Sequence, residues 1–235
     1  MMDTLLILIW ILLCLTGASI IGIFTKKYGS WIGISALAGL AVISNVLASA
    51  KIIAFPFGLS APAGIIAYAL SFFLMDLINE FYGKKEAMKG VYAGIIAQLI
   101  TIPMIWIVLQ WPAAPFMTSV QVNATNIALG LSPKLFIVSL IAFSIASIIN
   151  IYLFALLKKS THGALLWLRS KVSTISAIFV SNLIFIPIGY YGTGAPILNM
   201  IIGHSTVQIT IAIIDTLFMY IVVYLIKNGK DRTKV

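Results

Sequence analysis

Two acidic residues, Asp76 and Glu80, stand one helical turn apart in the apolar stretch 71–82. Asp76 precedes Lys84 by eight residues, which is about 12 Å along a helix, so a membrane-crossing helix here places Asp76 inside the hydrocarbon. A carboxylate at that depth costs roughly 2.5 to 3.5 kcal/mol unless it is paired or protonated. We therefore expect Asp76 to bind substrate or to exchange a proton. For Glu80, near the helix end, a functional charge and a structural ion pair with Lys84 are equally consistent with the sequence.

Asp215 also lies deep in an apolar run, twelve residues before Lys227, or about 18 Å of helix. Gln208 stands seven residues earlier, on the same helical face. The structural alternative for both is an interhelical hydrogen bond, which contributes only about 0.6 kcal/mol on average in membranes. Because a charge is a costly way to form one hydrogen bond, we expect Asp215 to carry a functional charge or a coupling proton.

Serine and asparagine residues gather in three other apolar runs. The pairs are Ser44 with Asn45, Ser147 with Asn150, and Ser181 with Asn182. A carboxamide presents a donor and an acceptor side by side, which matches the hydrogen-bonding edge of a nucleobase-like heterocycle. Phe72 or Tyr68 offers a ring face for stacking. These residues predict a polar cavity between helices.

Composition indicates which elements position these residues. Of 235 residues, 61% are hydrophobic and 9% are charged, whereas soluble domains are about half apolar and a quarter charged. We therefore predict an all-α polytopic membrane protein without a separate water-soluble domain. Seven apolar runs have spanning length, at residues 4–24, 31–54, 63–82, 91–109, 134–157, 172–191 and 206–226.

Basic residues mark one side of the membrane. All but Lys51 and Lys134 of the 15 Lys and Arg residues follow odd-numbered spans and precede even-numbered ones. The positive-inside rule then predicts an outside N-terminus and a cytoplasmic C-terminus in a multi-pass protein of the cell's inner membrane. The net charge of +9 thus reflects the bilayer rather than nucleic acid. On the outer side we expect loops at residues 111–133, with an interfacial segment at 127–131, and at residues 192–205.

Several other chemistries are not expected. Cys14 is the single cysteine, and His162 and His204 fall in predicted loops on opposite sides of the membrane, so the sequence offers no metal site. It has no glycine-rich phosphate-binding loop of a nucleotide hydrolase and no signature of an intramembrane protease. We expect neither an enzyme nor a cofactor-binding protein.

Three motifs lie on or beside these spans: Ser44-Asn45, Phe73-x-x-Asp76-x-x-x-Glu80-x-x-Gly83-Lys84-Lys85-x-Ala87, and Arg169-x-x-x-Ser173-Thr174, in which Arg169 and the nearby Lys171 belong to the predicted basic loop. Together they resemble the queuosine precursor transporter family, also called the vitamin uptake transporter family, over residues 43–220. The resemblance implies a six-helix core that imports 7-deazaguanines such as 7-cyano-7-deazaguanine, salvaged for tRNA modification. The expected domains are an extra N-terminal transmembrane helix (1–30), the transporter core (31–226) and a basic cytoplasmic tail (227–235).

The chain departs from the family pattern at several polar positions. Ser181 stands where members commonly carry an acid, and Gln208 lies near a common lysine. Ser147 and Asn150 stand where glutamine and aspartate are frequent, and Asp215 lies outside the pattern. These departures leave the identity of the substrate open.

We predict a secondary transporter or facilitator for a small purine-like heterocycle. The predicted substrate contacts are Ser44, Asn45, Phe72, Asp76, Asn150, Ser181, Asn182 and Gln208, with Phe72 stacking on the ring. The predicted proton-coupling or charged residues are Asp76, Glu80 and Asp215. The alternative is a subunit that captures a vitamin-like substrate for a separate ATPase. The sequence leaves open whether the protein forms a homo-oligomer. A third possibility is a purely structural membrane protein, which would bind no specific ligand.

Overall fold

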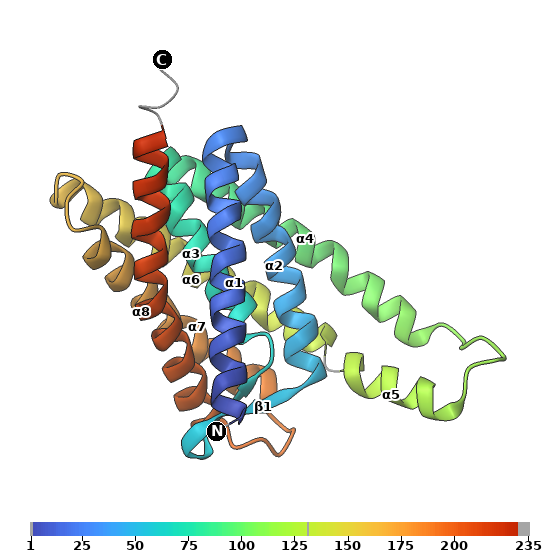
Figure 1. Cartoon of the computed structure of the whole chain (residues 1–235). Coiled ribbons are helices and arrows are strands. Elements are labelled where there is room, and N and C mark those ends of the chain that lie inside the picture. The colour runs from blue at the N-terminus through green and yellow to red at the C-terminus, as the bar shows by residue number, and fades with distance from the viewer. Residues whose placement is uncertain (1, 131, 230–235) are drawn as a thin grey trace.

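The computed structural model describes residues 2–130 and 132–229, which are mostly helical (Figure 1). The helices in this part of the chain are α1 (Met2–Tyr28), α2 (Ser30–Ala50), α3 (Ile65–Tyr82), α4 (Lys84–Gln110), α5 (Ser119–Gly130), α6 (Ser132–Ser160), α7 (Leu166–Tyr190) and α8 (Ile197–Gly229). A short hairpin of β1 (Ile52–Ala54) and β2 (Ser60–Pro62), with the 3-10 turn η1 (Pro56–Gly58), joins α2 to α3.

Within the described residues, seven helical segments are long and apolar enough to cross a membrane. Together they confirm the predicted all-α polytopic membrane protein, with every predicted span represented. The division into an extra helix at 1–30, a core at 31–226 and a tail at 227–235 stays a prediction, and residues 230–235 of that tail lie outside the described part.

Helix α3 lies at the centre of the bundle. Of its 18 residues, 13 are buried, and it packs against α1, α2, α4, α6 and α8. An apolar helix buried on all sides belongs in the interior of a bundle. The α3 segment that carries Asp76 and Glu80 is therefore enclosed by protein rather than by lipid.

The bundle has two distinct ends (Figure 1). The C-terminal ends of α1, α3, α6 and α8 lie at one end, which we call the basic end, and the β1–β2 hairpin lies at the other, the hairpin end. Most lysines flank the basic end, as the positive-inside pattern requires. Which end faces the cytoplasm remains a prediction.

The second predicted span is too long. Helix α2 ends at Ala50, where Lys51 turns to an extended conformation, and the chain then forms the hairpin instead of continuing to residue 54. Phe57 and Gly58 reverse the chain with positive φ angles of 64° and 70°. Glycine adopts such angles without steric cost, so Gly58 suits this tight turn.

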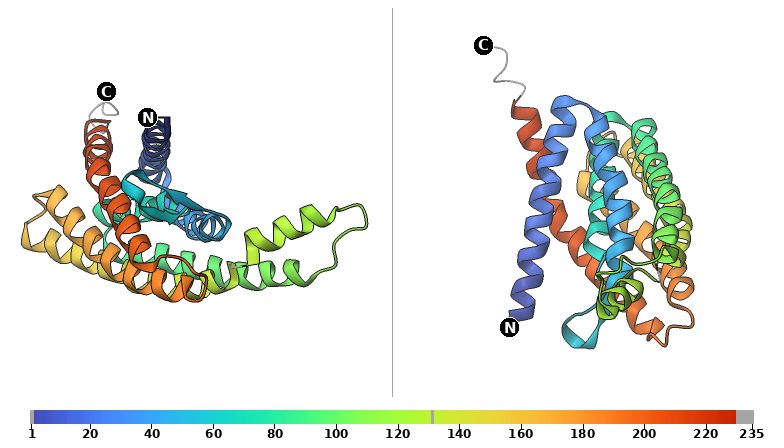
Figure 2. Two further views of the ribbon diagram at one scale, coloured as in Figure 1. Left: turned by 90° about the horizontal axis from the view of Figure 1, so that it is seen from below. Right: turned by 90° about the vertical axis from the view of Figure 1, so that its right-hand side faces the viewer.

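Two predicted outer loops contain helix. In the first, residues 119–130 form α5, which lies beside the far end of α4 and projects from the bundle (Figure 2). The predicted interfacial segment 127–131 is helical up to residue 130, and residue 131 lies outside the described part. In the second, residues 197–205 belong to α8, so His204 is helical rather than in a loop.

Arg169 and Lys171 also differ from the prediction. Both lie in the first turns of α7, whereas the sequence placed them in the loop before that span. Helix α7 begins at Leu166, six residues before residue 172, where the sequence predicted this span to start. Their side chains consequently reach the bundle interior.

Candidate functional site

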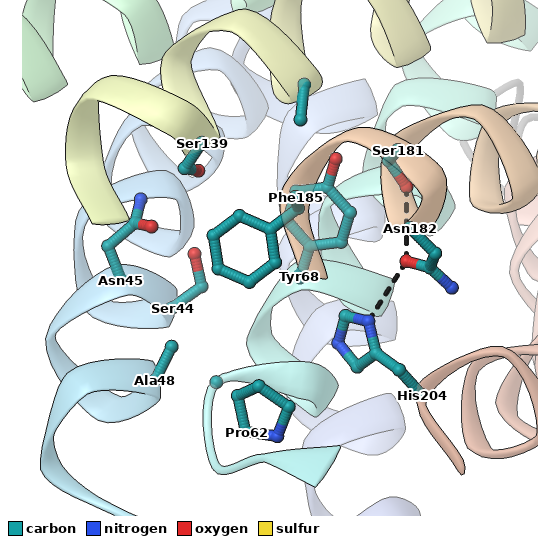
Figure 3. A pocket seen from close by; sticks show the side chains of 12 residues that line it. Ser44, Asn45, Ala48, Pro62, Tyr68, Ser139, Ser181, Asn182, Phe185 and His204 are labelled. Atoms are coloured by element: carbon teal, nitrogen blue, oxygen red, sulfur yellow. Dashed lines mark hydrogen bonds between the residues drawn. The ribbon is translucent and has the colours of Figure 1, made fainter. Parts of the chain in front are cut away.

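A narrow cavity lies in the half of the bundle nearest the hairpin end (Figure 3). The space between its walls is about 340 Å³ when the part open to solvent is counted, but the volume that the centre of a water molecule can occupy is only about 20 Å³. In this conformation the cavity has room for about one water molecule, so a larger ligand needs the cavity walls to move apart. Its lining comprises Ser44, Asn45, Ala48, Pro62, Gly64, Tyr68, Ser139, Ala142, Ser181, Asn182, Phe185 and His204. These residues come from α2, α3, α6, α7 and α8 and from the hairpin connection, and none of them is an Asp, Glu, Lys or Arg.

The α2 wall presents Ser44 and Asn45. The amide nitrogen of Asn45 donates to the carbonyl of Ala41 at 2.9 Å and to Oε1 of Gln98 in α4 at 3.2 Å. The amide oxygen is left toward the cavity. The hydroxyl of Ser44 donates to the same Ala41 carbonyl at 3.1 Å. Helix α4 thus orients a cavity residue without lining the cavity itself.

The opposite wall is organised around Asn182 in α7. Its amide nitrogen donates to Ser205 Oγ at 2.9 Å and to Gln208 Oε1 at 3.0 Å, both in α8. Its amide oxygen lies 2.9 Å from Nδ1 of His204 and 3.4 Å from the hydroxyl oxygen of Ser181. Gln208 therefore positions Asn182 from behind and does not line the cavity.

Two aromatic rings line the cavity, and a third supports them. The ring of Phe185 stands between Asn45 and His204 as seen in Figure 3, tilted by 33° to the imidazole at 6.4 Å between centroids. Tyr68 lines the cavity from α3. Phe72 is fully buried behind it, edge to face with Tyr68 at 5.2 Å, so the structure does not place Phe72 at the cavity.

A glycine permits the close packing around the cavity. Gly64, just before α3, lies so near Ser44 that a Cβ atom there would stand 1.8 Å from the Ser44 carbonyl oxygen. Atoms cannot approach that closely, so only glycine fits. This contact fixes the start of α3, and hence Tyr68, against the α2 wall.

Asp76 lies outside the cavity lining, in a second polar layer nearer the basic end. Its side chain is 1% exposed, and Oδ2 accepts hydrogen bonds from Ser170 at 2.6 Å and Thr174 at 3.3 Å. Asn150 donates to the same Thr174 hydroxyl at 3.2 Å. Oδ1 of Asp76 and Oδ1 of Asn150 have no hydrogen-bond partner in the described part of the chain.

The other two predicted acids are ion-paired. Asp215 accepts a hydrogen bond from Lys171. Glu80 pairs with Arg169 at 2.7 Å and Lys158 at 3.0 Å, rather than with Lys84 as one reading of the sequence allowed. Among the described residues, Asp76 alone of these three acids has no ion pair within 4.0 Å.

Four of the eight predicted contact residues therefore line one cavity: Ser44, Asn45, Ser181 and Asn182. Phe72, Asp76, Asn150 and Gln208 lie behind it or in the next layer. Sequence reasoning did not include Ser139, Phe185 and His204 in the site. Phe185 follows Asn182 by three positions, so the helical repeat places it on the same face and could have indicated it.

The described residues contain no group of three or more His, Cys, Asp or Glu side chains suited to a metal ion. The polar groups of the cavity are neutral amides, hydroxyls and an imidazole. Chemically, these side chains suit a small, uncharged and hydrogen-bonding molecule between aromatic rings, which the cavity can admit only after its walls move apart.

Comparison with known proteins identifies the family. Residues 62–222 match a family model described as "Putative vitamin uptake transporter". The chain is 27% identical over 225 residues to a Bacillus subtilis (strain 168) protein named "Probable queuosine precursor transporter", an alignment that covers 94% of this chain and 96% of the relative. No solved structure matches the chain. Because the family match spans well over half of the chain and confirms the predicted resemblance, this protein belongs to the vitamin uptake transporter family, a family of transporters rather than enzymes.

Proposed function

We propose that this protein imports a neutral, planar heterocycle of the 7-deazaguanine class, such as 7-cyano-7-deazaguanine. The observation that carries the proposal is the cavity, which combines amides, hydroxyls and aromatic rings and has no charged lining residue inside a membrane bundle. A neutral heterocycle needs no counter-charge but does need hydrogen-bond partners and stacking surfaces. The name of the Bacillus subtilis relative supports the same substrate class.

In the cavity, the ring of the substrate stacks against Phe185 or Tyr68. Aromatic stacking of a base contributes about 1–3 kcal/mol per ring and tolerates different heterocycles. Asn45 and Asn182 on opposite walls hold the polar edges. The Phe185 ring stands between the two walls (Figure 3). The substrate can therefore enter only if this side chain rotates away and makes room for the incoming ring.

The second polar layer is the next part of the transport path that the substrate contacts after the cavity. Asp76, Asn150 and Thr174 form it from α3, α6 and α7, between the cavity and the charged basic end. A substrate that leaves the cavity toward that end meets these side chains once the helices separate. In this way, the predicted contacts of Asp76 and Asn150 with substrate belong to a later step than those of Asn45 and Asn182.

The ion pairs close the basic end in the present conformation. Glu80 and Asp215 are each held by cations of α6 or α7, so their charges are compensated. The buried carboxylate of Asp76 has neutral donors and, in the described part of the chain, no ion pair within 4.0 Å. An intramembrane carboxylate of this kind suits proton exchange. We therefore assign proton coupling to Asp76 and closure of the basic end to Glu80 and Asp215.

Uptake by purified protein tests the proposal. Proteoliposomes containing the protein should accumulate labelled 7-cyano-7-deazaguanine saturably, in competition with unlabelled compound, whereas empty liposomes should not. Asn182→Leu should abolish the uptake, while Asn126→Ala in the projecting α5 should not change it. Uptake that occurs only in cells with a separate ATPase would favour the substrate-capturing subunit, and no uptake in either system would refute the proposal.

A further inference from the structure

We infer that the cavity selects its ligand by N–H donors, and that Asn45 Oδ1 and His204 Nε2 are acceptors that read them. The inference rests on the proposed function, because it assumes a purine-like ring in the cavity. His204 thereby becomes a specificity-determining residue. The assignment follows from the hydrogen bonds within the protein. Where the N–H and O–H groups of a lining side chain already donate to other protein atoms, only its acceptor atoms remain for a ligand.

The Asn45 amide has both hydrogens occupied. A carboxamide nitrogen carries two hydrogens, and that of Asn45 donates to the Ala41 carbonyl and to Gln98. The Ala41 carbonyl can only accept, which fixes the orientation of the amide. The oxygen that remains at the cavity is therefore an acceptor and cannot donate.

The tautomer of His204 follows from Asn182. In the orientation that the structure gives the Asn182 amide, its nitrogen donates to Ser205 and Gln208 and its oxygen lies 2.9 Å from His204 Nδ1. Since this oxygen only accepts, Nδ1 carries the hydrogen. The buried ring has no carboxylate partner among the described residues, and a neutral imidazole with Nδ1–H presents Nε2 as an acceptor.

Two serine hydroxyls also present acceptors to the cavity. Ser44 and Ser181 each donate to a backbone carbonyl of their own helix, at 3.1 and 3.0 Å, which leaves lone pairs for the cavity. Ser139 and Tyr68 supply hydroxyls that can donate to a ligand carbonyl. The lining thus offers several fixed acceptors and few donors.

A guanine-like edge has the complementary pattern. It presents a ring N–H beside an exocyclic 2-amino group, with one carbonyl to accept a hydrogen bond. A hypoxanthine-like ring lacks the amino group, so one fixed acceptor of the cavity would be buried without a partner. Such an unmade bond is unfavourable, which means that the 2-amino group should decide affinity.

Two ligands that differ only in this group test the selection. We expect purified protein to bind 7-deazahypoxanthine at least roughly tenfold more weakly than 7-deazaguanine in isothermal titration calorimetry. Equal affinities would overturn the donor-reading cavity while leaving the proposed transport of 7-deazapurines intact. Binding of neither compound, together with no uptake, would refute the proposed function and the inference with it.

Two substitutions isolate His204. In His204→Asn, the short amide can still donate to Asn182 from the Nδ1 position, but the acceptor at the Nε2 position is gone. His204→Gln places an amide oxygen near the Nε2 position. We expect His204→Asn to bind 7-deazaguanine roughly tenfold more weakly at an unchanged melting temperature, and His204→Gln to recover most of the affinity.

The melting temperatures of the two variants show whether His204 recognises the ligand or only stabilises the fold. Wild-type affinity in His204→Asn would overturn the assignment of His204, as would an affinity loss in both variants that follows their loss of thermal stability. If neither variant folds, the preference of the wild-type protein for 7-deazaguanine over 7-deazahypoxanthine still decides whether the cavity reads donors.

Discussion

Lys171 in α7 donates a hydrogen bond to the carboxylate of Asp215 in α8, and both side chains are largely buried. The pair joins two helices that also build the cavity wall of Asn182 and His204. Two opposite charges in this setting compensate each other, whereas either one alone would be an unpaired charge inside the bundle. The pair therefore stabilises the present packing of α7 against α8, because a shift of either helix would separate the two charges.

Removing one partner of this pair should destabilise the protein more than removing both. Asp215→Leu leaves the Lys171 ammonium unpaired, and breaking a buried pair in this way costs about 3–5 kcal/mol. The double variant Lys171→Met with Asp215→Leu should return close to the wild-type stability. Thermal unfolding of detergent-solubilised wild type, Asp215→Leu, Lys171→Met and the double variant checks this. Single variants as stable as the wild type would show that the pair is not buried in solution.

Asp76→Asn should leave the fold intact and abolish coupled uptake. The asparagine oxygen can still accept from Ser170 and Thr174, but the side chain can no longer exchange a proton. Wild-type uptake into proteoliposomes should rise when the outside is more acidic than the inside, and the variant should lose this response. Ser71→Ala, which removes a hydroxyl bonded to its own helix, is the matched control. Normal, gradient-dependent uptake in Asp76→Asn would remove Asp76 from coupling.

The spans of this protein could be predicted from the sequence because a bilayer demands about 20 apolar residues per helix. The helix ends could not. Hydropathy assigns charged residues such as Arg169 and Lys171 to loops, but here each finds an acidic partner inside the bundle. Those partners come from α3 and α8, and their proximity depends on tertiary packing that local composition does not encode.

The candidate site was predictable to a similar degree. Helical periodicity identified the polar faces of Asn45 and Asn182, and both line the cavity. Periodicity does not give the depth at which faces of different helices meet, so Asp76 and Asn150 were grouped with them although they lie one layer further. His204 was missed because it lies between Gly203 and Ser205, where the apolar run is interrupted and a loop was predicted, whereas α8 begins at Ile197.

Arg169→Lys should destabilise the basic end although the charge is kept. One guanidinium nitrogen of Arg169 donates to Glu80 and the other to the carbonyls of Gly163 and Ala164. A lysine ammonium cannot reproduce this fork, and unmade buried hydrogen bonds cost about 1–3 kcal/mol. Lys158→Ala, at a more exposed partner of Glu80, should cost less. Equal melting temperatures for Arg169→Lys and the wild type would contradict this role.

Gly64→Ala should be strongly destabilising for a purely steric reason. The added Cβ atom would lie 1.8 Å from the Ser44 carbonyl oxygen, and since both groups are fixed in the backbone, α2 and α3 must move apart. Overpacking of this kind typically costs about 1–3 kcal/mol and should also lower ligand affinity. Gly39→Ala in α2, where no atom lies within 4 Å, is the control and should leave the melting temperature unchanged or slightly raised. A stable Gly64→Ala protein would show that the two helices can separate at little cost.

The hairpin end should face the outside of the cell and the basic end the cytoplasm. Phe57 at the hairpin tip is fully exposed, and Lys159 is exposed at the basic end, so a cysteine at either position is open to reagents. In a Cys14→Ala background, a membrane-impermeant maleimide should label Phe57→Cys on intact cells and Lys159→Cys only after lysis. Because lysine and arginine favour the cytoplasmic side, the reverse pattern would require these basic segments to face outward. Labelling of both positions on intact cells would mean that the chain inserts in two orientations, and the assignment of an import direction to the cavity would then fail.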